Sequence, residues 1–147
     1  MDSNEAKQLV MNGYKLYQDK KMDELLALYH DDVEWVGPDS DFLPFAGTFH
    51  GKTGVVQFFT KLNQSQEALK FEPQQFIADG DKVVVMGTAT WQVRANGQTY
   101  ENPWVHIFTI RDGKVARFEQ FYNAAVPETA IRSGQNASAS QDASLRH

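Results

Sequence analysis

The sequence contains no cysteine, and this absence excludes disulfide bonds, thiolate metal sites and cysteine nucleophiles. It also lacks any apolar run near the roughly 20 residues that a membrane-spanning helix requires. No basic cluster is larger than the pair Lys20 and Lys21, and the net charge is −5, so binding to nucleic acid is not expected. The N-terminus lacks the basic and apolar regions of a signal peptide. These absences predict a cytoplasmic protein that contacts neither nucleic acid nor a membrane.

The 147 residues, of which 41% are hydrophobic, predict one globular domain that buries roughly two thirds of its unfolded surface. Regular apolar spacing runs through residues 1–127. Residues 128–147 are instead rich in serine, alanine, glutamine and asparagine, a composition typical of disorder. We therefore expect a folded domain over 1–127 and a polar, disordered tail over 128–147.

The first part of the chain has mainly helical spacing. An amphipathic helix is predicted over 4–18, preceded by the Asp2 and Glu5 spacing of a capping box. A short helix over 22–29 and a short strand over 33–36 should follow. A third helix is expected after Gly51, and its candidate cap is Thr53.

From Leu69 onward the apolar period becomes two, which is typical of strands. Short turns of Asp-Gly and Asn-Gly type separate the runs, and such turns favour hairpins. The predicted strands are 69–78, 82–95, 98–110 and 114–125, with turns at 79–80, 96–97 and 112–113. The expected fold class is α+β, in which three N-terminal helices pack on one face of a curved, mixed or antiparallel sheet.

The hairpin over residues 104–122 carries the sharpest functional pattern. On its first strand His106 shares one face with aromatic and aliphatic side chains, and on its second strand Gln120 does the same. A few polar groups among aromatic rings are typical of a ligand pocket, although a hydrogen-bonded core histidine would give the same pattern. The candidate ligand-binding residues are Trp35, Phe59, Trp104, Phe108, Phe118, Gln120 and Tyr122.

Other candidates for chemistry are fewer. His106 has a side chain suited to acid–base catalysis near neutral pH, and Tyr14 could assist it. Asp39 and Asp41 precede an apolar, proline-broken segment, so they could be a general base and its partner, or simply two carboxylates in a solvated turn. The four histidines show no metal-ligand spacing, and neither a metal nor another cofactor is expected.

Three strings resemble the NTF2-like superfamily, in its SnoaL-like and ketosteroid-isomerase-related branch. They are residues 22–35, 43–51 and 105–115, and the resemblance extends over about 5–125. It implies a cone-shaped sheet wrapped around the helices, with a deep apolar cavity at the open end. It also implies a homodimer formed through the outer sheet face.

The catalytic positions of the ketosteroid isomerases are mostly replaced in this sequence. The carboxylate base corresponds to Gly37, and the oxyanion-hole tyrosine corresponds to Gly13, next to Tyr14. The protonated aspartic acid of that site corresponds to His106, and the tyrosine of the third helix corresponds to Phe59. Steroid isomerisation by that mechanism is therefore not expected.

Many SnoaL-like sequences also carry an aspartate near the end of the last strand, where this chain has Asn123, which cannot titrate. The resemblance implies a SnoaL-like protein that binds a small hydrophobic molecule. It could be an isomerase, cyclase or hydrolase that uses His106 with Tyr14, Gln120 or the two aspartates. The alternatives are a ligand carrier without catalysis and a dimeric interaction module that uses the same fold.

Overall fold

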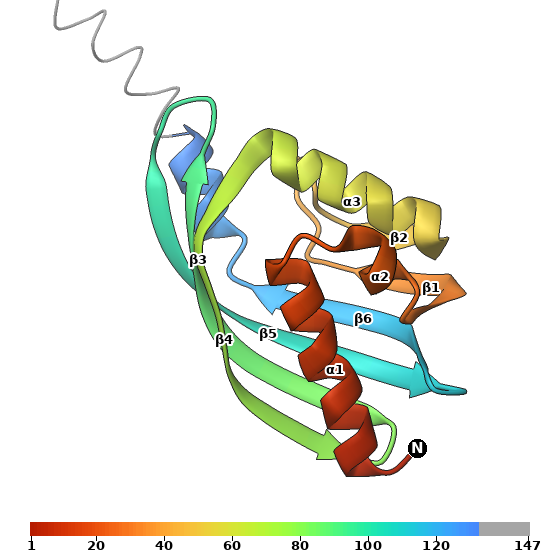
Figure 1. Cartoon of the computed structure of the whole chain (residues 1–147). Coiled ribbons are helices and arrows are strands. Elements are labelled where there is room, and N and C mark those ends of the chain that lie inside the picture. The colour runs from red at the N-terminus through yellow and green to blue at the C-terminus, as the bar shows by residue number, and fades with distance from the viewer. Residues whose placement is uncertain (133–147) are drawn as a thin grey trace, which may run out of the picture.

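The computed structural model describes residues 1–132, and its helices precede most of a curved, six-stranded sheet (Figure 1). Its helices are α1 (Ser3–Gln18), α2 (Met22–Leu26) and α3 (Gly51–Ser65). Its strands are β1 (Tyr29–Val36), β2 (Thr48–His50), β3 (Gln66–Asp79), β4 (Lys82–Val93), β5 (Thr99–Arg111) and β6 (Lys114–Tyr122). The predicted α+β class is confirmed.

The strands are arranged in the order β2-β1-β6-β5-β4-β3. β1 pairs with β6 in parallel, whereas the other neighbours are antiparallel. The three helices lie on one side of the curved, unclosed sheet (Figure 1). Side chains from that sheet face and from the helices form one core cluster. The sheet is therefore a half-cone whose inner face is covered by helices.

Local sequence signals explain several of the element boundaries. Asp2 caps α1, because its carboxylate accepts a hydrogen bond from the Glu5 backbone N–H and the Glu5 carboxylate accepts one from the Asp2 backbone N–H. At the last hairpin, Asp112 and Gly113 both have positive φ, at 52° and 73°. Two such residues make the tight turn whose twist suits a hairpin, as the Asp-Gly dipeptide predicts.

Two boundaries differ from the prediction. The second helix ends at Leu26, and β1 begins at Tyr29, because Tyr29 pairs with Val115 of β6 and is buried. Thr53 is not the cap of α3, since that helix starts at Gly51, directly after β2. The capping position is His50, which makes no side-chain capping bond.

A short helix over 125–132 follows β6. It contacts the rest of the domain through Asn96, whose side-chain amide donates to the carbonyl of Ala130 at 3.2 Å. Ser40 donates to the Glu128 carboxylate at 2.6 Å. The boundary predicted after residue 127 thus falls inside this helix. The rest of the predicted tail, from residue 133, lies outside the described residues.

Candidate functional site

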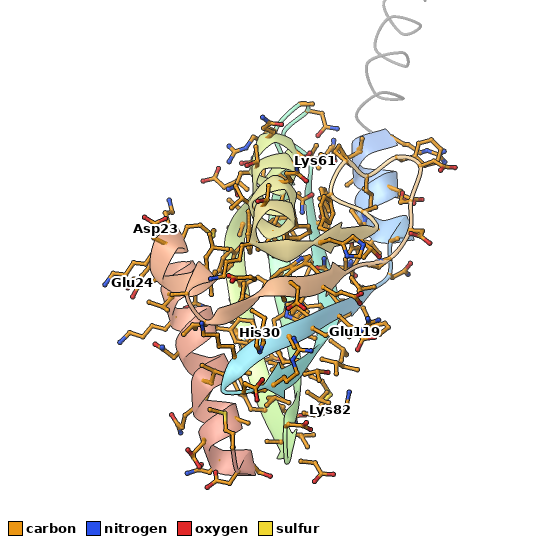
Figure 2. All side chains as sticks on the ribbon, turned by 90° about the vertical axis from the view of Figure 1, so that its right-hand side faces the viewer. Asp23, Glu24, His30, Lys61, Lys82 and Glu119 are labelled. Carbon is orange, nitrogen blue, oxygen red and sulfur yellow. The ribbon has the colours of Figure 1, made fainter. Side chains whose placement is uncertain are left out.

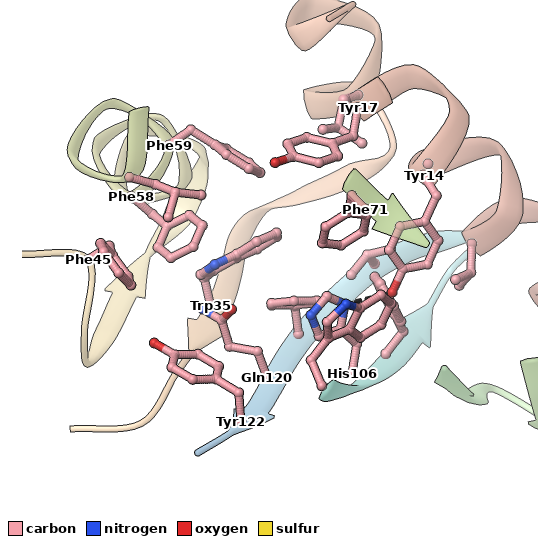
Figure 3. Close-up of a pocket in the computed structure, with 18 of the residues that line it drawn as sticks. Tyr14, Tyr17, Trp35, Phe45, Phe58, Phe59, Phe71, His106, Gln120 and Tyr122 are labelled. Carbon is pink, nitrogen blue, oxygen red and sulfur yellow. Dashed lines mark hydrogen bonds between the residues drawn. The ribbon is translucent and has the colours of Figure 1, made fainter. Parts of the chain in front are cut away.

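The helices and the inner sheet face enclose a cavity of about 110 Å³. Side chains from α1, α3, β1, β5 and β6 surround it in Figure 3. Tyrosine, tryptophan and phenylalanine rings form most of its wall, and all three tryptophans of the chain, Trp35, Trp91 and Trp104, line it. Among the lining residues that the structure describes there is no aspartate, glutamate, lysine or arginine. The cavity is therefore apolar and uncharged.

Charged groups instead gather on the outside of the molecule. Asp23, Glu24 and Lys61 project from the surface of the helical layer in Figure 2, and Lys82 projects from the far end of the sheet. Glu119 lies on the outer sheet face, where its carboxylate contacts the Arg117 guanidinium at 3.5 Å. This separation follows from the cost of burying an unpaired charge.

Strand alternation places His106 in the cavity wall. Along β5, Trp104, His106 and Phe108 share the inner face and are at least nine-tenths buried. His106 lies opposite Gln120 of β6 in the ladder, so the two side chains rise side by side from neighbouring strands. The indole of Trp104 stacks on the imidazole with ring centroids 4.0 Å apart, which fixes the plane of the ring.

Tyr14 reaches the same place from α1. Ala6, Val10 and Tyr14 are the buried residues of this helix, at intervals of four, and such residues share one helix face. The Tyr14 hydroxyl lies 2.6 Å from Nδ1 of His106. The contact joins the helical layer to the sheet at the centre of the cavity wall (Figure 3).

Burial sets the protonation of this pair. It lowers the pKa of His106 to about 3, because the imidazolium would lose its hydration without gaining a counter-ion. Burial also raises the pKa of the Tyr14 phenol, and Tyr29 adds to the shift. Both groups are neutral at pH 7, and the tautomer of His106 sets the direction of the bond. We assign the phenol O–H as the donor to Nδ1, because a phenol donates a hydrogen bond more strongly than it accepts one. This tautomer leaves the proton of the imidazole on Nε2.

Several other polar atoms in the cavity wall are buried without a hydrogen-bond partner in the described structure. Four of them belong to groups that can donate: Nε1 of Trp35, Nε1 of Trp104, Nε2 of Gln120 and the Tyr122 hydroxyl. The fifth is an acceptor, Oδ1 of Asn102. Unpartnered buried polar groups are uncommon in native proteins, and here all five residues line one cavity.

The structure brings most of the sequence candidates together. Tyr14, His106 and all seven candidate ligand-binding residues line the cavity. Asp39 and Asp41 do not line it, and both residues are exposed. The segment that follows them turns Phe45 into the cavity wall instead.

Sequence reasoning missed a second group of polar lining residues, Gln66, Tyr100 and Asn102. Asn102 and Tyr100 continue the alternation of Trp104 and His106 along β5, so an extension of that pattern by two steps could have found them. Gln66 gave no signal, because it falls in a stretch that reads as a polar exit loop.

The structure offers no group of histidine, aspartate or glutamate side chains able to hold a metal ion, as far as residues 1–132 are concerned. Over the same residues, no helix is both long and apolar enough to cross a membrane.

Comparison with known proteins agrees with this architecture. A family model described as the SnoaL-like domain matches residues 11–118. An NTF2-like protein from Burkholderia xenovorans LB400 superposes with a TM-score of 0.81 and 29% identity, over 88% of this chain and 98% of that one. TerC, co-crystallised with polyporic acid, has a TM-score of 0.79 and 29% identity, over 87% and 98% of the two chains.

A third similar structure comes from Pseudomonas putida KT2440 and is provisionally designated a polyketide cyclase. Its TM-score is 0.67 with 27% identity, over 82% of this chain and 93% of that one. No curated protein matches the chain.

Proposed function

We propose that this chain, which belongs to the SnoaL-like domain family, binds a small, uncharged, largely aromatic molecule in its cavity. The observation that carries the proposal is the composition of the cavity wall, which joins aromatic rings to a few unpartnered polar atoms and holds no charged residue. A mostly apolar pocket with a few convergent polar groups is the usual form of a small-molecule site. The similar protein that was crystallised with polyporic acid supports a small organic molecule as the ligand.

The charge state of the ligand follows from desolvation. An ion would have to leave water for a wall that offers no counter-charge, and this transfer costs several kcal/mol or more. His106 does not supply a cation, since its pKa is lowered to about 3 by burial. A neutral ligand avoids this cost and gains about 25 cal/mol for each Å² of apolar surface that it buries.

The unpartnered atoms near His106 are mostly donors. Trp35 and Gln120 offer N–H groups, and His106 in the tautomer set by Tyr14 offers Nε2–H. Donors seek acceptor oxygens, and a carbonyl accepts through two lone pairs without bringing a proton of its own. An aromatic ketone or quinone therefore fits this part of the cavity.

Ligand entry can be measured through the three tryptophans, since all of them line the cavity. We expect naphthalene and 2-acetylnaphthalene to change the tryptophan emission saturably, with the ketone bound more tightly. Gly13→Leu should weaken the binding of both compounds, because Gly13 lines the cavity. Asn12→Leu, on the exposed side of α1, should leave their binding unchanged. Equal titration curves for the wild type and Gly13→Leu, with calorimetry showing no heat of binding, would contradict the proposal.

Catalysis is a second candidate function, favoured by the 2.6 Å contact between Tyr14 and His106. A donor at Nε2 of His106 that is held against a carbonyl oxygen would stabilise the negative charge that develops when the adjacent carbon loses a proton. Such a step belongs to isomerase and cyclase chemistry, and polarisation of a carbonyl also assists hydrolysis. The cavity provides no carboxylate as base, and both ring nitrogens of His106 are engaged in this arrangement, so proton removal would fall to water.

Hydrogen exchange tests catalysis directly. The methyl protons of 2-acetylnaphthalene exchange with D₂O only through an enol, and NMR follows their loss. An enzyme should accelerate this exchange, and His106→Phe should abolish the acceleration while Asn12→Leu leaves it intact. If the protein binds the ketone but the exchange rate equals that in buffer alone, catalysis is contradicted and the protein acts as a carrier.

We also propose a homodimer through the outer sheet face. Ile77 and Phe121 are 55% and 50% exposed there. Val84 lies opposite Ile77 on the neighbouring strand, with Ile107 beyond it, and Val105 lies opposite Phe121. Contiguous exposed apolar surface of this kind often marks an interface. Light scattering should give twice the 16.6 kDa chain mass. Phe121→Asp should lower the measured mass to that of one chain, whereas Val56→Asp on α3 should leave the dimer mass unchanged.

A further inference from the structure

A second polar cluster lies in the cavity wall beyond Trp104, at the end away from Tyr14 and His106. It consists of Gln66, Tyr100, Asn102 and Tyr122. Gln66 and Asn102 are only 2% and 5% exposed, so their amide groups are cut off from bulk water. Polar groups buried this deeply need partners, because a buried group left without one loses its hydration and gains nothing in return.

Two of the four side chains are already partnered to each other. The Tyr100 hydroxyl donates to Oε1 of Gln66 at 2.8 Å. This bond fixes both side chains and uses the Tyr100 proton.

Asn102 is oriented but incompletely bonded. Its Nδ2 donates to the main-chain carbonyl of Asn123 at 3.2 Å, so the amide cannot be reversed without setting two acceptor oxygens against each other. The orientation leaves Oδ1 as a buried acceptor that has no partner.

Tyr122 supplies the complementary group. Its hydroxyl is also buried without a partner, and burial together with the negative charge of Glu128 raises its pKa to about 12. The phenol therefore keeps its proton at neutral pH and can donate. Tyr122 lies directly opposite Trp104 in the ladder, and Asn102 lies two positions before Trp104 on β5, so the free acceptor and the free donor belong to diagonal neighbours on the inner sheet face.

A free acceptor and a free donor on diagonal neighbours of one cavity wall match a hydroxyl group, which gives one proton and accepts another through its oxygen. We propose that the Asn102–Tyr122 end of the cavity is a hydroxyl-binding subsite, and that the preferred ligands are neutral phenols or aromatic alcohols. The ligand hydroxyl donates to Oδ1 of Asn102 and accepts from the Tyr122 hydroxyl. The inference rests on the proposed function, because it assigns the ligand class of the same cavity.

The position of the subsite sets the shape of the ligand. Asn102 and His106 are four positions apart on β5, which is roughly 13 Å along a strand, and Trp104 lies between them. The cavity volume of about 110 Å³ accommodates roughly eight to ten water-sized atoms. Two fused rings that carry the hydroxyl at one end have eleven non-hydrogen atoms, close to this upper limit.

Matched ligands test the subsite. The wild type should bind 2-naphthol about tenfold more tightly than naphthalene, the gain of roughly one net hydrogen bond. It should bind 2-methoxynaphthalene, which has no proton to give to Asn102, about as weakly as naphthalene. The tryptophan emission and calorimetry both give the dissociation constants.

Variants locate the effect. Asn102→Leu and Tyr122→Phe should each reduce the preference for 2-naphthol several-fold while leaving naphthalene affinity within a factor of two. Tyr122→Phe keeps the ring and removes only the free hydroxyl, so it tests the subsite even if Asn102→Leu does not fold. Asn12→Leu is the control, because Asn12 lies on the exposed side of α1 outside the cavity, and it should not change the preference.

The outcomes separate the two proposals. If naphthalene binds but 2-naphthol binds no better, or if the preference survives both Asn102→Leu and Tyr122→Phe, the subsite is wrong and a bound water satisfies Asn102, while the proposed function stands. If no naphthalene derivative binds, the proposed function and the subsite fall together.

Discussion

The Tyr14 hydroxyl and Nδ1 of His106 lie 2.6 Å apart although 92 positions of sequence separate the two residues. The contact joins α1 to the middle of β5 in a part of the cavity wall that is otherwise made of rings. Tyr14 also packs against Phe76, Trp104 and Phe108 with ring centroids 5.8–5.9 Å apart. Ring packing and the hydrogen bond therefore both hold the Tyr14 side chain, and a single substitution can separate their contributions to stability.

Tyr14→Phe keeps the ring and removes the hydroxyl. We expect the free energy of unfolding to fall by about 1–2 kcal/mol, because Nδ1 of His106 then remains buried without its donor. Urea denaturation at pH 7 measures the change. Tyr17→Phe is the matched control: it removes a hydroxyl from the same helix for which the described structure shows no hydrogen bond, and it should cost less. Equal losses in the two variants would contradict the assigned bond.

His106 makes stability depend on pH with a definite sign. Its pKa is about 3 in the folded protein, lowered by burial from 6.5, so the unfolded chain binds more protons between those values. Stability should therefore fall as the pH drops below about 6.5 and should continue to fall towards 3. Between pH 7 and pH 5 the contribution of this residue is about 2 kcal/mol.

The test compares the wild type with His106→Gln, which cannot titrate. Carboxylates also contribute to acid denaturation, but their contribution is common to both proteins and cancels in the difference. The stability difference between the two proteins should change by about 2 kcal/mol from pH 7 to pH 5. A difference that is constant with pH would show that the imidazole titrates normally.

Much of the site could be predicted from one hairpin. Alternation placed His106 and Gln120 on facing strands. The Asp112–Gly113 turn pairs Arg111 with Lys114, and a register shift between Thr109 and Ile110, which the sequence pattern did not reveal, then brings Gln120 opposite His106. Strand patterns are informative here because the sheet has one buried and one exposed face. The same pattern extends to Asn102, two alternations further along β5.

Loops and helix rotation were harder to predict. Asp39 and Asp41 lie in an irregular segment whose path depends on where Phe45 finds burial, and no periodicity reports that choice. Tyr14 follows Gly13 by about 100° around α1, yet both line the cavity, because the buried stripe of an amphipathic helix is at least that wide. The unpartnered atoms of the wall depend on side-chain rotamers, which sequence spacing does not specify.

Gly37 controls the position of the Gln120 amide. A Cβ at Gly37 would lie 2.9 Å from Nε2 of Gln120, so Gly37→Ala should push this flexible group aside. The stability loss should stay below about 1.5 kcal/mol, the cost of an off-rotamer side chain. The side-chain amide resonances of Gln120 should shift in NMR spectra, and the affinity for 2-acetylnaphthalene should change. An unchanged Gln120 resonance would show that the amide does not face Gly37.

Gly87 is a position where any side chain should be costly. It pairs with Trp104 and Pro73 across the sheet, and a Cβ there would lie 2.3 Å from the carbonyl oxygen of Glu72 and 2.5 Å from the Trp104 ring. The backbone cannot yield as a flexible side chain does, so Gly87→Ala should destabilise the protein by about 3 kcal/mol. Thermal and urea denaturation would both register the loss.

Gly13→Ala is the matched control for Gly87→Ala, because its Cβ would meet only the methyl groups of Leu25 and Leu28 at 3.7 Å, an ordinary contact. Gly13 lies inside α1, where alanine is favoured over glycine by up to about 1 kcal/mol, so this variant should be slightly more stable than the wild type. Opposite signs at the two glycines would show that close packing of Trp104 against β4, rather than a general need for glycine, constrains this side of the cavity. A neutral Gly87→Ala would mean that the indole has room to move, and the cavity wall beside His106 would then be softer than the stacked rings indicate.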